Sequence, residues 1–152
     1  MQIIPASSNP KIFFSRPHTT FIQIIQDDDG DWATVKGDFD RTQNKWKLDL
    51  YHSAKVKVGS RSALSKKVMD SCKSLAFEEF VLQAKNVTQT VEVGCGFFAI
   101  AYAEVLARGE NPRCLEFDTI QMSKHLWTCF EDKQIKAFPL NIQKSQTKGS
   151  SV

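Results

Sequence analysis

The sequence predicts an α+β domain in which a mostly antiparallel sheet packs against one central, buried helix. Two observations carry this prediction. Short runs rich in β-branched and aromatic residues fill the first part of the chain, and residues 95–108 form one helical segment that is apolar nearly all round. A helix without a polar face has to be covered on every side, so it belongs at the centre of a domain. A chain of 152 residues has room for a single domain of that kind.

The strands are predicted in the first third of the chain. Residues 20–26 form a β-rich run, and residues 32–36 resume it after the Asp-Gly pair at 29–30, which predicts a type I′ hairpin. Residues 38–44 are a polar loop. Residues 46–51 alternate apolar and polar side chains, as expected of a half-buried strand.

A first helix is predicted after this sheet. Ser60 or Ser62 can cap its N-terminus, and residues 80–83 then form a short strand. The apolar stripe of this helix, at helical spacing, consists of Leu64, Val68, Cys72 and Leu75.

Two further helices close the domain. The apolar helix at 95–108 ends before Gly109, a typical glycine just beyond a helix C-terminus. Asp118 with Gln121 resembles a capping box for a last helix that runs to about Lys133.

The flanking segments are expected to lie outside the domain. Residues 1–18 hold three prolines and are expected to be an irregular lead-in. Residues 141–152 are polar and basic, which predicts a disordered tail. The domain itself is expected at 19–140, without an internal repeat.

Composition excludes several functions. With 20 basic and 17 acidic residues, the net charge of +3 is too balanced to indicate nucleic-acid binding. No apolar run reaches the ~18 residues of a membrane span, and the N-terminus lacks the features of a signal peptide. We therefore expect an intracellular protein, nuclear or cytoplasmic, with no membrane partner. The widely spaced cysteines fit reduced thiols: Cys72, Cys95, Cys114 and Cys129.

No metal or other cofactor is expected. His125 and Cys129 stand four residues apart on one helix face, but two ligands do not make a zinc site. The acidic residues at 27–31 suggest a calcium loop, which fails because Ile25 and Lys36 occupy ligand positions. A hairpin turn explains these acidic residues better.

The segment around Cys95 carries the candidate chemistry. A thiol at a helix N-terminus lies at the positive end of the helix dipole, which favours the thiolate. Gly94 and Gly96 on either side of it clear space for the backbone of another chain. Gln89, six residues upstream, could help to hold an oxyanion through its side-chain amide.

Gln89, Cys95, Gly96 and the helix after them resemble the nucleophile segment of the ubiquitin-like-modifier (SUMO) proteases. The resemblance is greatest to a divergent branch carried by transposon-type genes of invertebrates, and it covers roughly residues 17–139. The segments similar to the strands and the closing part of that family are 21–25, 31–35, 48–53, 107–112, 122–130 and 138–139.

The resemblance implies a shortened papain-like α+β fold, an isopeptide or peptide substrate ending in Gly-Gly, and no cofactor. The partner would be a ubiquitin-like modifier or its conjugates, bound by a monomer. In the family, the tryptophan that corresponds to Trp32 lies over the thin Gly-Gly tail of the modifier.

The chain departs from the family at both remaining catalytic positions. Asp31 precedes Trp32, where the family has histidine, and His52 precedes Ser53 near the family's acid position. Gly94 stands where the family usually has aspartate. A cysteine protease needs an imidazole beside the sulfur, whereas a carboxylate there repels a thiolate. A rotated His52 that reaches Cys95, oriented by Asp31, would restore the base.

Each site residue also has a structural interpretation. Cys95 could be a small buried residue, Gln89 a loop residue, Trp32 part of the core and His52 an ordinary surface histidine. Neither His18 nor His125 has a stronger claim to be the base. Three hypotheses therefore stay open: an active protease with exchanged His52 and Asp31, an inactive homologue that binds a modifier or another partner, and a transposon-derived fragment without function.

Overall fold

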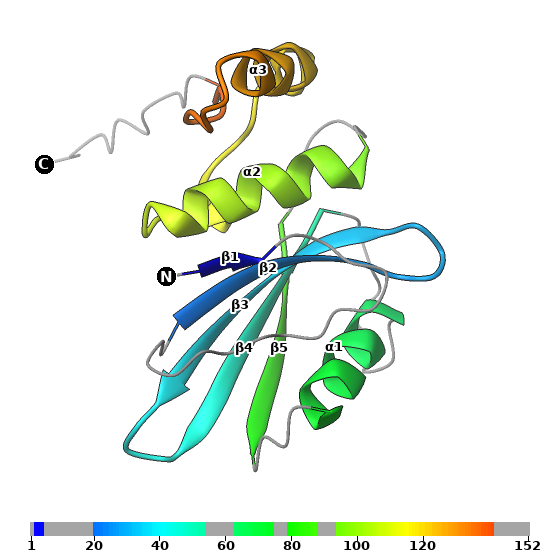
Figure 1. The fold of residues 1–152 in the computed structure, drawn as a ribbon, viewed down its shortest axis with the longest axis vertical. Coiled ribbons are helices and arrows are strands. Elements are labelled where there is room, and N and C mark those ends of the chain that lie inside the picture. The colour runs from blue at the N-terminus through cyan, green and yellow to red at the C-terminus, as the bar shows by residue number, and fades with distance from the viewer. Residues whose placement is uncertain (1, 5–19, 54–62, 75–78, 88–93, 142–152) are drawn as a thin grey trace, which may run out of the picture.

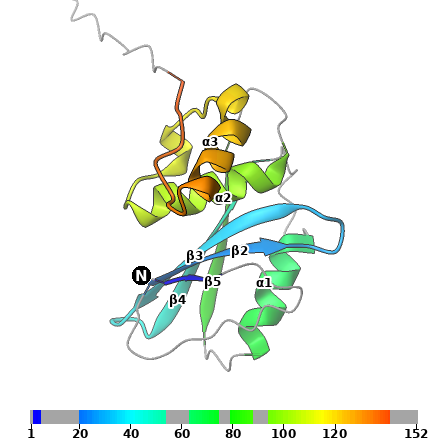
Figure 2. The ribbon, with the colours of Figure 1, turned by 45° about the horizontal axis from the view of Figure 1, so that its top comes forward.

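The computed structural model describes residues 2–4, 20–53, 63–74, 79–87 and 94–141. They form a five-stranded sheet in the order β1-β2-β3-β4-β5, with helices on both of its faces (Figure 1). Helix α1 covers one face, α2 lies across the other, and α3 is stacked on the outer side of α2 (Figure 2). The α+β class and the central helix agree with the prediction from sequence.

The sheet is mixed, which corrects the expectation of a mostly antiparallel one. The three inner strands pair antiparallel, whereas both outer pairs, β1 with β2 and β4 with β5, are parallel. The edge strands arrive through longer connections, which permit parallel pairing. The strands are β1 (Gln2–Ile4), β2 (Thr20–Gln26), β3 (Trp32–Asp40), β4 (Lys45–His52) and β5 (Phe80–Asn86).

Strand β1 lies within the segment expected to be an irregular lead-in. Its residues Gln-Ile-Ile pair with residues 21–23 of β2, and this long-range pairing extends the sheet by one edge strand. Residues 5–19 and 142–152, which include the rest of the lead-in and the tail, lie outside the described residues.

The β2–β3 hairpin is present, but its turn is not of type I′. A type I′ turn needs a positive φ at both central residues, and only Gly30, with φ +90°, has one in this loop. The carbonyl oxygen of Asp27 accepts the Gly30 N–H, and the backbone N–H of Asp27 donates to the Asp31 carbonyl oxygen. The Asp27 carboxylate also accepts the N–H groups of Asp29 and Asp31, and these bonds stabilise a three-residue loop.

Strand β3 continues to Asp40, four residues beyond its predicted end. Gly37 permits this because the Phe21 ring of β2 lies directly over it, at the place a Cβ atom would occupy. Phe39 then packs on Trp46 of β4, with ring centroids 5.3 Å apart. The polar loop shrinks to residues 41–44 as a result.

Helix α1 (Ala63–Ser74) buries Leu64 and Val68 against one face of the sheet, as its stripe predicts. Its expected caps and Leu75 lie outside the described residues, as does the side chain of Cys72. The core on this face also contains Phe21, Ile25, Ala33, Val35, Trp46, Leu48 and Leu50.

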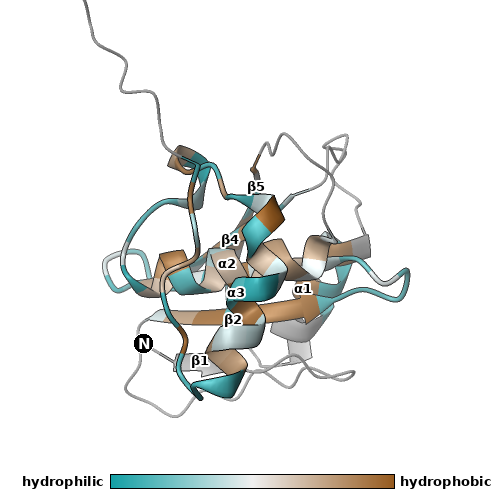
Figure 3. Cartoon of the chain, turned by 90° about the horizontal axis from the view of Figure 1, so that it is seen from above, coloured by the Kyte–Doolittle hydropathy of each residue, from teal (hydrophilic) through white to brown (hydrophobic). Residues whose placement is uncertain are grey.

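Helix α2 (Cys95–Ala107) forms the second core, between the sheet and α3. Figures 1 and 2 show α2 between the sheet and α3, and Figure 3 views these layers from above. Helix α2 ends one residue before the predicted Arg108, which is its C-cap, and Gly109 follows with φ +82°. The buried members of this core include Ile22, Tyr51, Val87, Phe98, Tyr102, Val105, Phe117, Met122 and Phe138.

Helix α3 (Thr119–Glu131) follows a short 3-10 turn, η1 (Pro112–Cys114). The Asp118 carboxylate accepts the N–H groups of Ile120 and Gln121, which confirms it as the N-cap. The second bond of a capping box, from the Asp118 backbone N–H to the Gln121 side chain, is replaced by another. The Gln121 side-chain amide donates to the Asp118 carboxylate, and the backbone N–H of Asp118 donates to the Pro139 carbonyl oxygen. Of the described helices, none has the length and apolarity needed to cross a bilayer.

Candidate thiol site at the N-terminus of α2

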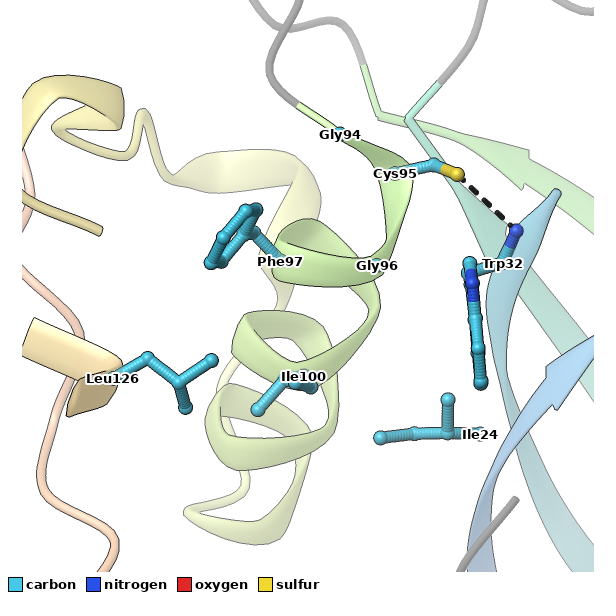
Figure 4. A pocket seen from close by; sticks show the side chains of 8 residues that line it. All are labelled: Ile24, Trp32, Gly94, Cys95, Gly96, Phe97, Ile100 and Leu126. Carbon is cyan, nitrogen blue, oxygen red and sulfur yellow. Dashed lines mark hydrogen bonds between the residues drawn. The ribbon is translucent and has the colours of Figure 1, made fainter. Parts of the chain in front are cut away.

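The start of α2 meets the start of β3 at Cys95. The Cys95 sulfur accepts a hydrogen bond from the backbone N–H of Trp32, at 3.3 Å (Figure 4). Because Cys95 is the first residue of α2, its sulfur lies at the helix end where backbone N–H groups have no helical partner. Two backbone dipoles, from the helix and from β3, therefore point their positive ends towards this sulfur.

Thr34 holds α2 in position on β3. Its hydroxyl donates to the carbonyl oxygen of Ala99 at 2.6 Å, and the whole contact is buried. Thr34 lies two residues after Trp32, and Ala99 lies about one helical turn after Cys95. This hydrogen bond fixes the position of α2 along β3 and so helps to place the sulfur beside the Trp32 N–H.

An apolar groove of about 560 Å³ opens beside the sulfur. Figure 4 shows the Trp32 ring on the β3 side and Leu126 of α3 on the opposite side. No lining residue carries a charge, so an occupant would meet mainly apolar surface and the thiol. The lining residues are Ile24, Trp32, Gly94, Cys95, Gly96, Phe97, Ile100 and Leu126.

The two glycines beside Cys95 keep this region open. A Cβ atom at Gly96 would stand 3.6 Å from the Trp32 ring, in ordinary contact, so a longer side chain would enter the space between helix and ring. A Cβ atom at Gly94 would meet only Phe97, at 3.8 Å. Small residues at 94 and 96 therefore leave the sulfur accessible from the groove.

Asp31 directly precedes Trp32 in the chain and is not among the described residues that line the groove. It is exposed at the end of the β2–β3 loop, and its backbone N–H donates to the Asp27 carboxylate. Residue 31 directly precedes the N–H group that contacts the sulfur. The position at which the family resemblance leads one to expect an imidazole holds an exposed aspartate.

His52 is not brought to the sulfur. Tyr51 pairs with Thr34 and belongs to the core beneath α2. Because successive side chains of a strand point to opposite faces, His52 points to the α1 face of the sheet, away from Cys95. It is only 4% exposed, so the interpretation as an ordinary surface histidine is wrong. Strand β5 pairs with β4 up to its last residue, His52, which lies opposite Asn86, so β5 covers this end of β4.

Two other residues considered for the site lie outside the described part of the chain. These are Gln89 and His18, and the oxyanion role of Gln89 stays a prediction. His125 is engaged on α3, where its Nε2 lies 3.1 Å from the Lys136 carbonyl oxygen and 3.4 Å from the Cys129 sulfur. Within the described ranges, no three potential metal ligands are grouped to hold an ion.

Tyr51 is the titratable group with a clear perturbation next to this site. Burial raises the pKa of its phenol above the ordinary value of 10.0, and the negative charges of Asp49 and Asp38 act in the same direction. The neutral phenol thus belongs to the core on which α2 rests.

The sequence did not single out the groove walls or the Thr34 anchor. Phe97 and Ile100, three residues apart on α2, share a helix face that could have been recognised. Ile24 and Leu126 come from β2 and α3, and only the tertiary packing brings them to the same groove.

Comparison with known proteins gives structural similarity alone. No protein-family model matches the chain, and no curated protein sequence does. The crystal structure of the ASFV pS273R protease is similar with a TM-score of 0.43 and 14% identity, over 64% of this chain and 37% of that chain. The Legionella pneumophila effector protein RavZ is similar with a TM-score of 0.36 and 18% identity, over 59% and 30% of the two chains. The match thus covers only about a third of the length of each of these two chains.

Proposed function

We propose that residues 19–140 form a cysteine-peptidase homologue of the ubiquitin-like-modifier protease type. Its substrate would be the C-terminal Gly-Gly tail of a ubiquitin-like modifier or the bond that follows it. One observation carries this proposal: the Cys95 sulfur, at the start of α2, accepts the Trp32 N–H at the mouth of an apolar groove. The sequence resemblance at Gln89, Cys95 and Gly96 points to the same class.

The groove supplies what an extended tail needs. Trp32 and Gly96 both line the groove, and glycine adds no side chain to its wall. A Gly-Gly segment has no side chains either, so it can lie along this part of the groove where larger residues would collide. The carbonyl carbon of the last glycine would then lie close to the sulfur.

Catalysis is proposed to be impaired. Attack by sulfur requires a group that takes the thiol proton and later gives it to the leaving amine, a task that imidazole performs near neutral pH. Asp31 occupies the family's imidazole position, and His52 points to the other face of the sheet. Binding of the tail does not depend on proton transfer, so it is proposed to persist.

Binding of modifiers to the full chain with Cys95→Ala tests this proposal without turnover. Purified ubiquitin-like modifiers are titrated by calorimetry, each compared with a version that lacks its last two glycines. We expect at least one modifier to bind and to lose affinity on truncation. Equal affinity of every modifier for the chain with and without its Gly-Gly would overturn the proposal.

A matched pair of variants locates the binding. Gly96→Ala adds a methyl group in ordinary contact with Trp32 and is expected to bind like the parent. Gly96→Leu adds a side chain that has to enter the groove and is expected to abolish tail-dependent binding. Circular dichroism and thermal melts verify that both variants are folded. Unchanged binding by folded Gly96→Leu would place the tail elsewhere.

A further inference from the structure

Helix α3 carries three large apolar side chains that are exposed to solvent. Ile120 is 91% exposed, Trp127 64% and Phe130 75%, and the two rings stack with centroids 5.9 Å apart. The buried residues Met122 and Cys129 mark the side of α3 that packs on the domain, and Ile120 and Trp127 lie on the opposite side of the helix. Among the described elements, α3 lies outermost on this side of the sheet (Figure 1). The α3 patch, formed by Ile120, Trp127 and Phe130, is therefore a candidate contact surface.

Two opposite charges border the α3 patch. Lys124 and Glu131, seven residues apart, are exposed on the same side of the helix as Trp127. Two helical turns separate them by about 10 Å, too far for an ion pair within the helix. In the described part of the chain, neither takes part in an ion pair within 4.0 Å. The Glu131 carboxylate accepts the Trp127 Nε1–H at 3.0 Å, so this charge lies directly beside the exposed ring.

We propose that the α3 patch binds the same patch of a second copy of this chain, with the two α3 helices antiparallel. In a contact with two-fold symmetry, every pair of residues occurs twice. An antiparallel contact centred between residues 127 and 128 places Lys124 of each copy opposite Glu131 of the other, and it brings the two Trp127 rings together at the centre. A parallel contact would leave both ion pairs unmade. This inference is independent of the proposed function, and it replaces the monomer expected from the family resemblance.

The α3 patch has the size and border of a weak protein contact. A large aromatic side chain can bury about 150–250 Å², so the patch offers on the order of 400 Å² per copy, at the low end of specific interfaces. We therefore expect a dissociation constant in the micromolar range. The border carries both signs of charge, which favours a second copy over an anionic lipid surface, because a helix that binds such a surface has a basic border.

Analytical ultracentrifugation of the full chain, from about 1 µM to 1 mM, tests this inference. We expect the average mass to rise with concentration from that of a monomer towards that of a dimer. Trp127→Ala is expected to weaken the dimer at least about a hundredfold, because it removes the central contact from both copies. Val81→Ala is the matched control, since it removes exposed apolar atoms from β5 instead, and it is expected to leave the dimer unchanged. Thermal melts verify that both variants are folded.

Exchange of the two charges tests the antiparallel arrangement. Lys124→Glu and Glu131→Lys are each expected to weaken the dimer about tenfold, because either substitution turns both ion pairs repulsive. An equimolar mixture of these two variants is expected to regain a dimer that contains one copy of each. The chain that carries both substitutions is expected to dimerise like the parent.

Three results would each overturn the inference. They are a monomer at every concentration, a dimer that survives in folded Trp127→Ala, and a mixture of the two charge variants that associates as weakly as either variant alone. Flotation with vesicles of phosphatidylcholine and phosphatidylserine covers the lipid alternative. Vesicle binding by monomeric wild type that is lost in Trp127→Ala would assign the patch to a membrane surface and would also overturn the dimer. All of these results leave the groove and its proposed function untouched.

Discussion

Replacing Thr34 with valine removes the hydroxyl that fixes α2 on β3 and keeps the shape of the side chain. The Thr34 hydroxyl is 2.6 Å from the Ala99 carbonyl oxygen, and the Thr34 side chain is fully buried. A buried hydrogen bond contributes about 1 kcal/mol net to stability, and more when its loss leaves a buried group unsatisfied. The Ala99 carbonyl keeps its helical bond within α2, so we expect a loss of about 1 kcal/mol.

Urea unfolding followed by circular dichroism measures this loss. With a slope of about 2 kcal/mol per molar urea for a small domain, the midpoint should fall by about 0.5 M with an unchanged slope. Thr128→Val is the matched control, because the Thr128 hydroxyl makes the same type of bond, to the Lys124 carbonyl, on the exposed side of α3. Its effect is expected to stay within about 0.5 kcal/mol.

Equal midpoints for Thr34→Val and Thr128→Val would refute the reasoning. They would mean that the buried bond does not stabilise the contact between α2 and β3, and that other packing sets the position of Cys95. A larger loss for Thr34→Val, with the control unchanged, supports Thr34 as the anchor of the site.

Three further predictions concern the scaffold. Gly37→Ala would place a Cβ atom 2.1 Å from the buried Phe21 ring and should lower the free energy of unfolding, measured in urea, by about 1–3 kcal/mol. Gly96→Ala should leave that free energy unchanged or raise it. Equal effects of the two variants would contradict the packing described for β3. Asp118→Ala should lower the stability of the fold by about 1 kcal/mol through loss of the α3 cap, whereas Asp118→Asn, which can still cap, should retain most of it. Identical thermal melts of the two variants would argue against the cap. The folded protein should lose stability above pH 10, because the raised pKa of Tyr51 means that the phenol ionises first in the unfolded chain. Absorbance at 295 nm, compared between the parent and Tyr51→Phe, should show that Tyr51 in the folded protein titrates with a midpoint above pH 10. A midpoint at or below pH 10 would contradict the burial of Tyr51.

The helix at the centre of the fold could be predicted within one residue. Its apolar sequence requires burial on all sides, and Gly109 marks its end, so both signals are local in the chain. The strand near 20–26 was recognisable from its β-rich composition and the strand near 46–51 from its alternating side chains, and both signals are local. The parallel pairing of β1 with β2 could not be recognised in this way, because no local sequence pattern indicates that these two segments pair.

The site was predictable only in part for the same reason. The sequence places Cys95 at a helix start and Asp31 before Trp32, and the structure joins these two segments. The direction of His52 depends on the register between β3 and β4, where a shift by one residue would turn its side chain to the opposite face. The groove collects side chains from four separate elements, β2, β3, α2 and α3, which only their packing brings together.

Hydrolysis of a fluorogenic amide of a tail peptide ending in Leu-Gly-Gly tests the central claim most directly. The claim is that Cys95 and the Trp32 groove form a peptidase-type thiol site in which Asp31 occupies the place of the imidazole. Wild-type protein, Asp31→His, and Asp31→His with Cys95→Ala are compared at neutral pH. The account predicts little hydrolysis by wild type, an increase of at least about tenfold in Asp31→His, and its loss in the double variant. Hydrolysis by wild type that depends on Cys95 and falls in Asp31→His would contradict it.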